Sequence, residues 1–361
     1  MRPLIVGAGP AGCAAAITLA RGGITPVLVE RSREPGDALC GGFLSWRSLE
    51  ALAGLGTDAR DLNAEAIRSV RLFAGHCHAE ALLPAPGLAV SRHRLDSLLL
   101  ERAAAAGAGV EQGVAVREVQ GTKVRLQDGT AIDPPALLLA SGKHDVRGLP
   151  RPATARGRDP TLGLRLRLPP CPTLTRLIGN SVELHLLPGG YAGLALQEDG
   201  SANLCLAVHR SATDAAGGPA AYLRTLGDAG PLGERLAGAD LDARFDAVAN
   251  VPYGWRVGTG ADRLFRLGDQ AGVIPSLAGE GMGIALASGI DAARTLLTYG
   301  PGAAPTWQRR FDRRLRRPIG VADAVRALAE GRGRGALVSL ARVPGLIQVV
   351  AAATRIAHHM P

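Results

Sequence analysis

The chain has 361 residues, and its 41 Lys and Arg residues outnumber 32 Asp and Glu residues, which gives a formal net charge of +9. This length suits two lobes that share an interface. Only Lys123 and Lys143 are lysines, so the positive charge does not form a lysine-rich nucleic-acid tail. Aromatic residues make up 3% of the chain, which leaves few stacking platforms for bases. We therefore expect a small-molecule substrate and no nucleic-acid partner.

The cysteines are typical of a reduced protein, because they are odd in number, widely spaced and free of any Cys-x-x-Cys pair. They are Cys13, Cys40, Cys77, Cys171 and Cys205. No run of eighteen apolar residues occurs, and the first apolar run enters a glycine-rich loop with no room for a cleavable leader. We predict a cytoplasmic protein and leave open a peripheral position on the inner membrane.

Strands and helices alternate over the first 140 residues, which predicts a parallel sheet covered by helices. The expected strands lie at 3–6, 27–29, 114–116, 124–126 and 137–140, and the expected helices at 11–21 and 92–106. After Leu149 the pattern changes to the alternation of an antiparallel sheet, at 182–187, 191–196 and 203–208. A buried strand at 264–267 and a helix at 281–297 then resume the first lobe, and helices follow from Thr306.

The first loop carries a nucleotide-binding pattern, Gly7-Ala8-Gly9-Pro10-Ala11-Gly12, between a strand and a helix. Gly7 permits the tight turn, Gly9 lets a pyrophosphate approach the backbone, and Gly12 permits close packing of the helix. Glu30 ends the next strand, where its carboxylate can accept hydrogen bonds from an adenosine ribose and would repel a 2′-phosphate. The pattern predicts a dinucleotide other than NADP at this loop.

A second glycine motif follows the late strand, as Gly268-Asp269 and then Pro275-Ser276-Leu277-Ala278-Gly279-Glu280-Gly281-Met282-Gly283. Together the two motifs resemble the FAD-dependent oxidoreductases of the geranylgeranyl reductase and para-hydroxybenzoate hydroxylase superfamily. The resemblance implies FAD as cofactor, with Asp269 on the ribityl chain and Pro275, Gly279 and Gly281 against the flavin ring. The helix that begins near Gly281 would direct its positive end at the ring, where reduction places negative charge.

The resemblance extends to further residues. Cys40-Gly41-Gly42 matches a segment of the geranylgeranyl-reductase-like branch, and Arg92 lies where an arginine that contacts FAD is usual. Cys40 is equally compatible with a substrate-side role and with ordinary packing. Arg92 is also compatible with a solvated arginine at the start of a helix. The full expected cofactor-binding set is Gly7, Gly9, Pro10, Ala11, Gly12, Glu30, Arg31, Cys40, Gly41, Arg92, Gly268, Asp269, Pro275, Gly279, Gly281 and Met282.

The fold that this resemblance implies is α/β: a Rossmann-like FAD-binding lobe of the glutathione-reductase type, a mostly antiparallel β substrate lobe and C-terminal helices. We expect residues 1–75, 90–150 and 258–300 to form the discontinuous FAD-binding domain. Residues 76–89 and 151–257 would form the substrate domain, and 301–361 a helical region.

Two departures from the family pattern affect the chemistry. Ser141 stands where hydroxylases carry the aspartate of an Asp-Gly motif that contacts the nicotinamide donor, so NAD(P)H or a separate protein is left open as electron donor. The prenyl-reductase signature is reduced to Gly190-Tyr191-Ala192-Gly193-Leu194. Candidate substrate-pocket residues are Cys40, Tyr191, Tyr253 and Trp255.

We therefore predict a geranylgeranyl-reductase-like oxidoreductase that transfers hydride from reduced flavin to a lipophilic or aromatic, polyketide-like molecule. One alternative is a monooxygenase that hydroxylates an aromatic ring through a flavin C4a-hydroperoxide, and another is a non-catalytic FAD-binding protein. No motif assigns a catalytic acid or base. No metal site is expected, because Gly75-His76-Cys77-His78 places Cys77 on the opposite strand face from its neighbours.

A helix predicted from Trp307 to Pro318 gathers arginines on one side, at positions 309, 310, 313, 314 and 317. A solvated basic face is its simplest interpretation. Together with apolar segments at 337–343 and 346–356, this face is also compatible with contact to an anionic membrane surface.

Overall fold

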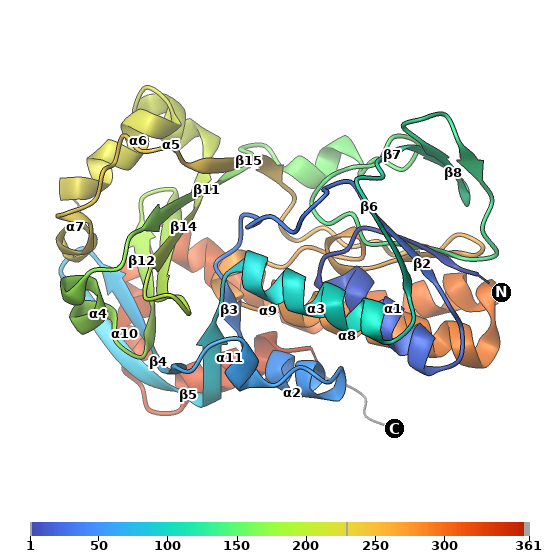
Figure 1. Ribbon diagram of the computed structural model, residues 1–361. Coiled ribbons are helices and arrows are strands. Elements are labelled where there is room, and N and C mark those ends of the chain that lie inside the picture. Colours follow the sequence, from blue (N-terminus) through green and yellow to red (C-terminus); the bar gives the residue numbers. More distant parts are fainter. Residues whose placement is uncertain (1, 229, 357–361) are drawn as a thin grey trace.

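The structure is a computed structural model that describes residues 2–228 and 230–356. It confirms an α/β fold, with a parallel sheet in one half of the molecule and a larger mixed sheet in the other (Figure 1). A small third sheet lies beside the parallel one.

The parallel sheet is built from short apolar runs whose side chains are buried on both faces, as expected of a sheet covered on both sides. Its strand order is β16-β10-β1-β2-β6, and every pair is parallel. The strands are β1 (Leu4–Val6), β2 (Val27–Glu30), β6 (Gly109–Gln112), β10 (Leu137–Leu139) and β16 (Leu264–Arg266).

Helices α1 (Pro10–Arg21), α3 (Arg92–Ala105) and α8 (Gly281–Tyr299) pack together on one face of this sheet, with α1 between the other two. The α1 and α8 helices approach closely at Gly289, where a Cβ atom would lie 2.3 Å from the Ala11 carbonyl oxygen. The other face is covered by the small antiparallel sheet of β7 (Val116–Gln120), β8 (Lys123–Leu126) and β9 (Ala131–Ile132).

The strand predicted at 114–116 begins only at Val116. Val114 instead donates its N–H to the Glu30 carbonyl, directly after a turn at Gly113, whose φ of 76° favours glycine. The short strand β6, which the sequence analysis missed, occupies the edge of the parallel sheet just before that turn.

The mixed sheet has the strand order β15-β11-β14-β13-β12-β4-β5-β3, and only the β12–β4 pair is parallel. Its strands are β3 (Phe43–Leu44), β4 (Ala66–Ala74), β5 (Cys77–Ala89), β11 (Thr161–Leu168), β12 (Ser181–Leu187), β13 (Gly190–Leu196), β14 (Ala202–His209) and β15 (Asp246–Val251). Residues 66–74 thus pair in this sheet, although the expected boundaries group them with the first domain. The Arg71 side chain ties β4 to its neighbours, because it contacts Glu80 and Glu183 at 3.1 and 3.5 Å.

Short helices complete this half of the molecule. They are α4 (Pro172–Ile178), α5 (Arg210–Ala215), α6 (Pro219–Thr225) and α7 (Pro231–Leu236), while α2 (Trp46–Gly54) packs on α8. Leucines of α4, α6 and α7 form a buried cluster with leucines of β11, β13 and β14. The outer face of the mixed sheet is therefore covered, and its inner face remains for the site described below.

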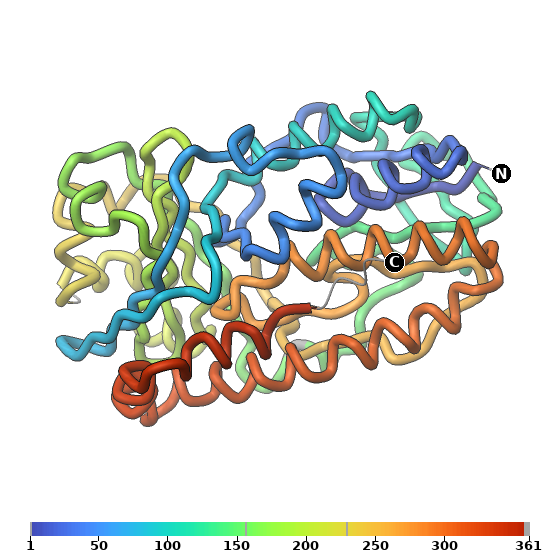
Figure 2. The backbone as a smooth tube through the Cα atoms, turned by 90° about the horizontal axis from the view of Figure 1, so that it is seen from below, coloured from blue at the N-terminus to red at the C-terminus, as the bar shows by residue number. Residues whose placement is uncertain are grey.

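Three helices end the described chain: α9 (Ala304–Glu330), α10 (Arg334–Ala341) and α11 (Leu346–Thr354). Figure 2 shows α9 running along the molecule before α10 and α11 turn back. The prediction that this helix stops at Pro318 is wrong, because α9 continues to Glu330 through that proline. Buried side chains at helical spacing, Trp307, Phe311, Leu315, Ile319 and Ala322, anchor the face on both sides of it.

Two of the five arginines predicted to form a basic face on this helix are not simply solvated. Arg310 and Arg314 pair with Asp291 of α8 at 3.2 and 3.1 Å. Over the two described ranges, no single helix is both long and apolar enough to cross a membrane; α10 and α11 reach that length and apolarity only jointly, and they meet at a bend of 108°.

Candidate functional site

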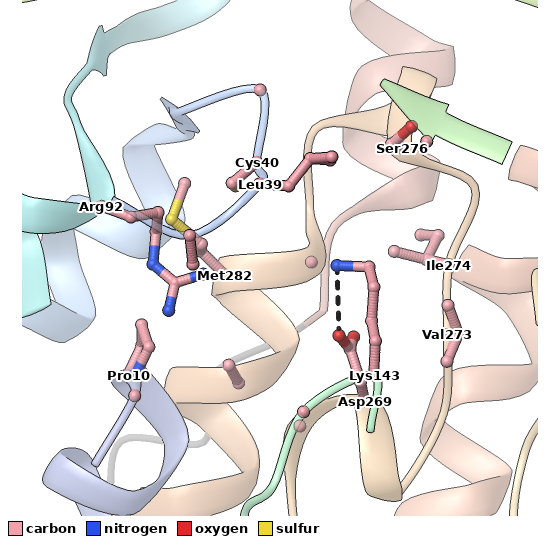
Figure 3. Close-up of a pocket in the computed structure, with 18 of the residues that line it drawn as sticks. Pro10, Leu39, Cys40, Arg92, Lys143, Asp269, Val273, Ile274, Ser276 and Met282 are labelled. Atoms are coloured by element: carbon pink, nitrogen blue, oxygen red, sulfur yellow. Dashed lines mark ion pairs between the residues drawn. The ribbon is translucent and has the colours of Figure 1, made fainter. Parts of the chain in front are cut away.

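A cavity of about 1110 Å³ lies between the parallel sheet and the inner face of the mixed sheet. Residues that follow the carboxyl ends of β1, β2, β10 and β16 line one end of it, which is the usual ligand position in an open parallel sheet. Figure 3 shows side chains from these loops pointing into the space.

The loop after β1 presents bare main chain to the cavity. Gly7 has a φ of 102°, and a Cβ there would lie 2.5 Å from the Ala140 carbonyl oxygen. At Gly12 a Cβ would lie 1.9 Å from the Gly7 carbonyl oxygen, so the helix packs against its own loop. No side chain caps the start of α1, which leaves its first amides and the positive end of the helix for an anion.

Glu30 lies beside this loop at the end of β2. Its two carboxylate oxygens accept hydrogen bonds from the Ala8 N–H at 2.9 Å and the Ser32 N–H at 3.0 Å. A carboxylate has about four acceptor positions, so each oxygen can still accept a ribose hydroxyl. The next residue, Arg31, also lines the cavity and contacts His144, whose pKa is lowered by burial and by that arginine.

Arg92 opens α3 and lies in the cavity rather than in bulk solvent. Its guanidinium donates two hydrogen bonds to the Asp96 carboxylate, at 2.9 and 2.7 Å. The main-chain N–H of Arg92 donates to the Asp37 carboxylate. Burial disfavours the charged guanidinium, but the Asp96 carboxylate outweighs that effect and raises the pKa of Arg92. Burial in turn raises the pKa of Asp96. The solvated interpretation of Arg92 is therefore wrong.

Asp269 follows β16 and faces Lys143, which follows the neighbouring β10; their charged atoms are 3.4 Å apart (Figure 3). Arg151 fixes both loops, because its guanidinium donates to the carbonyl oxygens of Gly142, Lys143 and Asp269 at 2.8 to 2.9 Å. The Asp269 carboxylate raises the pKa of the Lys143 ammonium against the opposing effect of burial.

The second glycine loop approaches the cavity from the start of α8. Gly279 has a φ of 62°, and a Cβ there would lie 2.7 Å from the Phe43 ring. Gly281 opens the helix with no atom within 4 Å of its missing Cβ. Glu280 is fully buried between them and faces Arg355 at 3.3 Å, and burial raises its pKa to about 7.

Cys40, Gly41 and Met282 also line the cavity. The mixed sheet holds the main chain at Cys40, because its carbonyl oxygen accepts hydrogen bonds from the Asn203 amide at 2.9 Å and the Cys205 thiol at 3.0 Å. This anchoring holds Cys40 at the junction of the two sheets.

Three hydroxyl groups meet where the second glycine loop touches the mixed sheet. Ser276 Oγ lies 2.5 Å from Tyr191 Oη and 2.7 Å from Tyr253 Oη, and Leu277 donates its N–H to Tyr191. Burial raises the pKa of Tyr191, so the phenol stays protonated. Trp255 is not part of this group: it lines a separate hollow beside Arg256, and its ring lies under the Arg151 guanidinium at 4.9 Å.

The remaining cavity wall is apolar. The mixed sheet and the C-terminal helices face each other across the cavity, so the apolar tail for which the sequence analysis left membrane contact open is a wall of the site. The lining side chains are Val70, Leu72, Leu83, Val182, Leu184, Leu194, Leu337, Leu340, Leu346, Ile347 and Val350.

Sequence reasoning did not assign Lys143, Arg151, Ser276 or the Glu280–Arg355 pair to the site. Lys143 follows a predicted parallel strand next to the phosphate loop, and that position is the signal that would have identified it. Arg151 and Arg355 carry no such signal, because they reach the site from outside both motifs. Pro275 and Gly12 lie beneath the lining residues.

These features fit FAD. The cavity combines the start of α1 without a side-chain cap, the Glu30 carboxylate beside the same loop and the start of a second helix, α8. No metal or second cofactor is needed to account for them.

The comparisons with known proteins agree. Residues 1–147 match the FAD binding domain family. The chain is 31% identical to a menaquinone reductase of Mycolicibacterium smegmatis over 82% of its own length and 76% of that protein. It is 28% identical to digeranylgeranylglycerophospholipid reductase 1 of Methanopyrus kandleri, over 79% and 77% of the two chains.

A solved structure of a probable FAD-dependent monooxygenase from Pseudomonas aeruginosa shares the fold, with a TM-score of 0.73 and 20% identity over 94% of this chain and 99% of the other. Reductases and a monooxygenase thus share this architecture, and a non-catalytic role is not favoured. The chain is an enzyme with FAD as its cofactor, and it belongs to the FAD-dependent oxidoreductases of the geranylgeranyl reductase and para-hydroxybenzoate hydroxylase superfamily.

Proposed function

We propose that this enzyme transfers hydride to a lipophilic or aromatic, polyketide-like small molecule bound between the mixed sheet and the C-terminal helices. The observation that carries the proposal is the apolar wall of the cavity, to which β4, β12, α10 and α11 contribute. An apolar wall recognises its ligand by burying apolar area, at about 25 cal/mol per Å². Bound FAD supplies the hydride.

The cofactor-binding roles follow the polarity of the cavity. We propose that the open amides of α1 and Arg92 bind the FAD phosphates and that Glu30 binds the adenosine ribose. Asp269 would bind the ribityl chain, and the start of α8 would lie at the flavin ring. In this assignment the parallel sheet belongs to a Rossmann-like FAD-binding lobe of the glutathione-reductase type, and the mixed sheet to the substrate lobe.

The apolar wall would also exclude water from the reacting atoms. Leu337 and Leu340 of α10 and Ile347 of α11 face the mixed sheet across the cavity. The Tyr191, Ser276 and Tyr253 hydroxyls form a polar group within this region, and we assign them to orienting a polar end of the substrate. Such a combination of apolar walls and a few placed polar groups is typical of small-molecule sites.

The electron donor is tested separately from the substrate. Ser141 directs its hydroxyl to the His144 carbonyl oxygen at 3.1 Å, within its own loop. We propose that NAD(P)H is a poor direct donor and that a separate protein supplies the electrons. Anaerobic mixing of the FAD-loaded enzyme with NADPH or NADH, followed by absorbance at the flavin band, checks this; reduction within seconds would contradict it.

The hydride proposal is tested with menaquinone-4, chosen because one relative is a menaquinone reductase. The enzyme is reduced anaerobically with one equivalent of dithionite and mixed with the probe, and the mixture is then exposed to air. A mass gain of two hydrogens that survives air shows reduction of a carbon–carbon bond, since a reduced quinone ring reoxidises. Two results together would overturn the proposed substrate class: recovery of the quinone unchanged, and no measurable binding of any member of a panel of aromatic polyketides.

A pair of variants locates the binding region. Leu184→Arg places a charge in the apolar wall and should weaken menaquinone-4 binding at least tenfold with FAD retained. Leu82→Arg is the control, because Leu82 is 67% exposed on β5 and does not line the cavity. Equal losses in both variants would contradict the assignment.

We also propose peripheral membrane contact at the C-terminal helices. Two exposed apolar side chains of this tail do not line the cavity: Val343, between α10 and α11, and Val349, on α11, are 50% and 64% exposed. Cosedimentation with vesicles of anionic phospholipid, for the wild type and for Val349→Asp, measures this contact. Wild-type protein that stays in the supernatant at low salt would rule it out.

A further inference from the structure

Lys143 is one of two lysines in the chain, and it occupies an unusual position for such a residue. It follows β10, whose neighbour β1 leads into the phosphate loop. Its side chain is 30% exposed and points into the cavity, as Figure 3 shows. A strongly hydrated ammonium is costly to place in such a site unless it is paired or has a function.

The surroundings hold the ammonium in place. The Lys143 and Gly142 carbonyl oxygens both accept hydrogen bonds from Arg151, and Gln270 donates to the Gly142 and His144 carbonyl oxygens at 2.9 Å. The main chain of the lysine is therefore fixed at both sides. The ion pair with Asp269, whose carboxylate lies 3.4 Å from the ammonium, holds the side chain itself.

The charges of the cavity define what this lysine would do. Arg92 has its own carboxylate partner in Asp96, so its charge is balanced locally. Asp269 is the proposed ligand of the ribityl chain, so its carboxylate would be shared between the ribityl hydroxyls and Lys143 and would balance only part of the lysine charge. The ammonium remains charged at neutral pH, because the Asp269 carboxylate raises its pKa. The start of α8 adds a second positive potential on the same cavity.

We propose that the Lys143 ammonium is a fixed positive charge beside the flavin ring that raises the reduction potential of the bound FAD. This inference rests on the proposed placement of FAD in the cavity. Two-electron reduction adds negative charge to the ring, and a nearby positive charge in a partly dry site stabilises that charge more than the same ammonium would in water. Lys143 acts only through its charge: it transfers no proton and forms no covalent bond.

The test uses the FAD-loaded protein and needs no substrate. Sulfite adds reversibly to the oxidised flavin ring and leaves negative charge on it, so its dissociation constant, followed at the flavin absorbance band, reports the same stabilisation. Lys143→Met removes the charge at similar length, and Lys143→Arg retains it. Lys123→Met is the matched control, because Lys123 is the other lysine and lies on β8 outside the cavity.

We expect Lys143→Met to weaken sulfite binding at least tenfold and to lower the midpoint potential, by about 30 mV for each tenfold change in the two-electron equilibrium. Lys143→Arg and Lys123→Met should stay within threefold of the wild type. Sulfite affinity and potential unchanged in Lys143→Met would overturn the inference while leaving the proposed function intact. Loss of FAD from Lys143→Met but not from Lys143→Arg would also overturn it, in favour of an anchoring role. A wild-type protein that binds no FAD would instead refute the proposed placement itself.

Discussion

The two ends of the cavity are built by different means. The end at the parallel sheet consists of main chain: glycines without Cβ atoms, open helix amides and carbonyl oxygens held by Arg151. The end at the mixed sheet consists of aliphatic side chains from several elements. Where ligand phosphates must contact the main chain, only glycine fits at particular positions. An apolar ligand can instead be bound by many combinations of leucine and valine side chains. The first end therefore specifies its ligand more narrowly.

The largest effect on FAD binding is expected at Gly12. Gly12→Ala would place a Cβ 1.9 Å from the Gly7 carbonyl oxygen, so the phosphate loop must move. We expect FAD binding to weaken by about 100-fold, equivalent to about 3 kcal/mol, in a fluorescence titration. Gly54→Ala in α2 is the control, because no atom lies within 4 Å of its added Cβ. FAD affinity equal to that of the wild type in Gly12→Ala would show that this end of the cavity does not require glycine and would contradict the difference between the two ends.

A variant in the mixed sheet is expected to lose stability rather than affinity for FAD. Glu183 is fully buried and pairs with Arg235 through two contacts of 2.9 Å. Glu183→Ala removes the buried partner of that arginine and leaves only the exposed Glu234 at 3.1 Å, so we expect a loss of about 3–5 kcal/mol in urea unfolding. The FAD affinity of the folded protein should change less than twofold. Asp242→Ala breaks an exposed ion pair with Arg224 and should cost less than about 1 kcal/mol; equal losses in the two variants would show that burial is not decisive.

Glu280 joins the two ends and gives a pH dependence of known sign. Burial raises its pKa from 4.5 to about 7, so the carboxyl binds a proton more tightly in the folded protein than in the unfolded one. Its contribution to stability is complete below about pH 4.5 and is lost as the pH rises through 7, by up to about 3 kcal/mol. Unfolding of the wild type and of Glu280→Gln between pH 4.5 and 8 measures the difference, and identical pH profiles would contradict it.

The smallest effect concerns the hydroxyl group at Ser276. Tyr191→Phe removes the acceptor of the Leu277 N–H, and we expect a loss of about 1 kcal/mol in the free energy of unfolding. FAD affinity should stay within twofold, while affinity for menaquinone-4 should fall. Tyr299→Phe is the control on an exposed ring. A larger loss of FAD than of the probe would assign Tyr191 to the cofactor end.

The same difference explains how much could be predicted from the sequence. The phosphate loop and Glu30 were predicted from their spacing, and the Gly268-Asp269 segment from the family resemblance; all three line the cavity. Such prediction is possible because main-chain contact with a ligand requires rare residues in a fixed order. The apolar wall was missed: the apolar segments at 337–343 and 346–356 were predicted to be helical, with contact to a membrane surface left open. Leucines of a wall and leucines of a membrane-binding helix look alike in sequence, and only packing against β4 and β5 distinguishes them.

Long-range polar contacts were beyond prediction for a related reason. Arg355 lies 75 positions from its partner Glu280, and nothing local to either residue indicates the other. The boundary of the mixed sheet was misplaced at β4 for the same reason, because its parallel pairing with β12 joins segments more than a hundred residues apart. Trp255 was a pocket candidate because it precedes the return of the chain to the first lobe, and its ring instead packs against Arg151.

The strand order of the parallel sheet also sets the sequence of assembly. The strand β16 and the helix α8 come from residues 264–299, yet they complete the sheet and cover the face of α1 that carries the phosphate loop. A growing chain that has emerged only to residue 147, the extent of the matched domain, has its phosphate loop but lacks the partner of Ala11 and Ala14. The phosphate loop is therefore among the first segments to be synthesised, but the cofactor site is among the last parts to be completed. Free FAD can stabilise the folded state only near the end of folding.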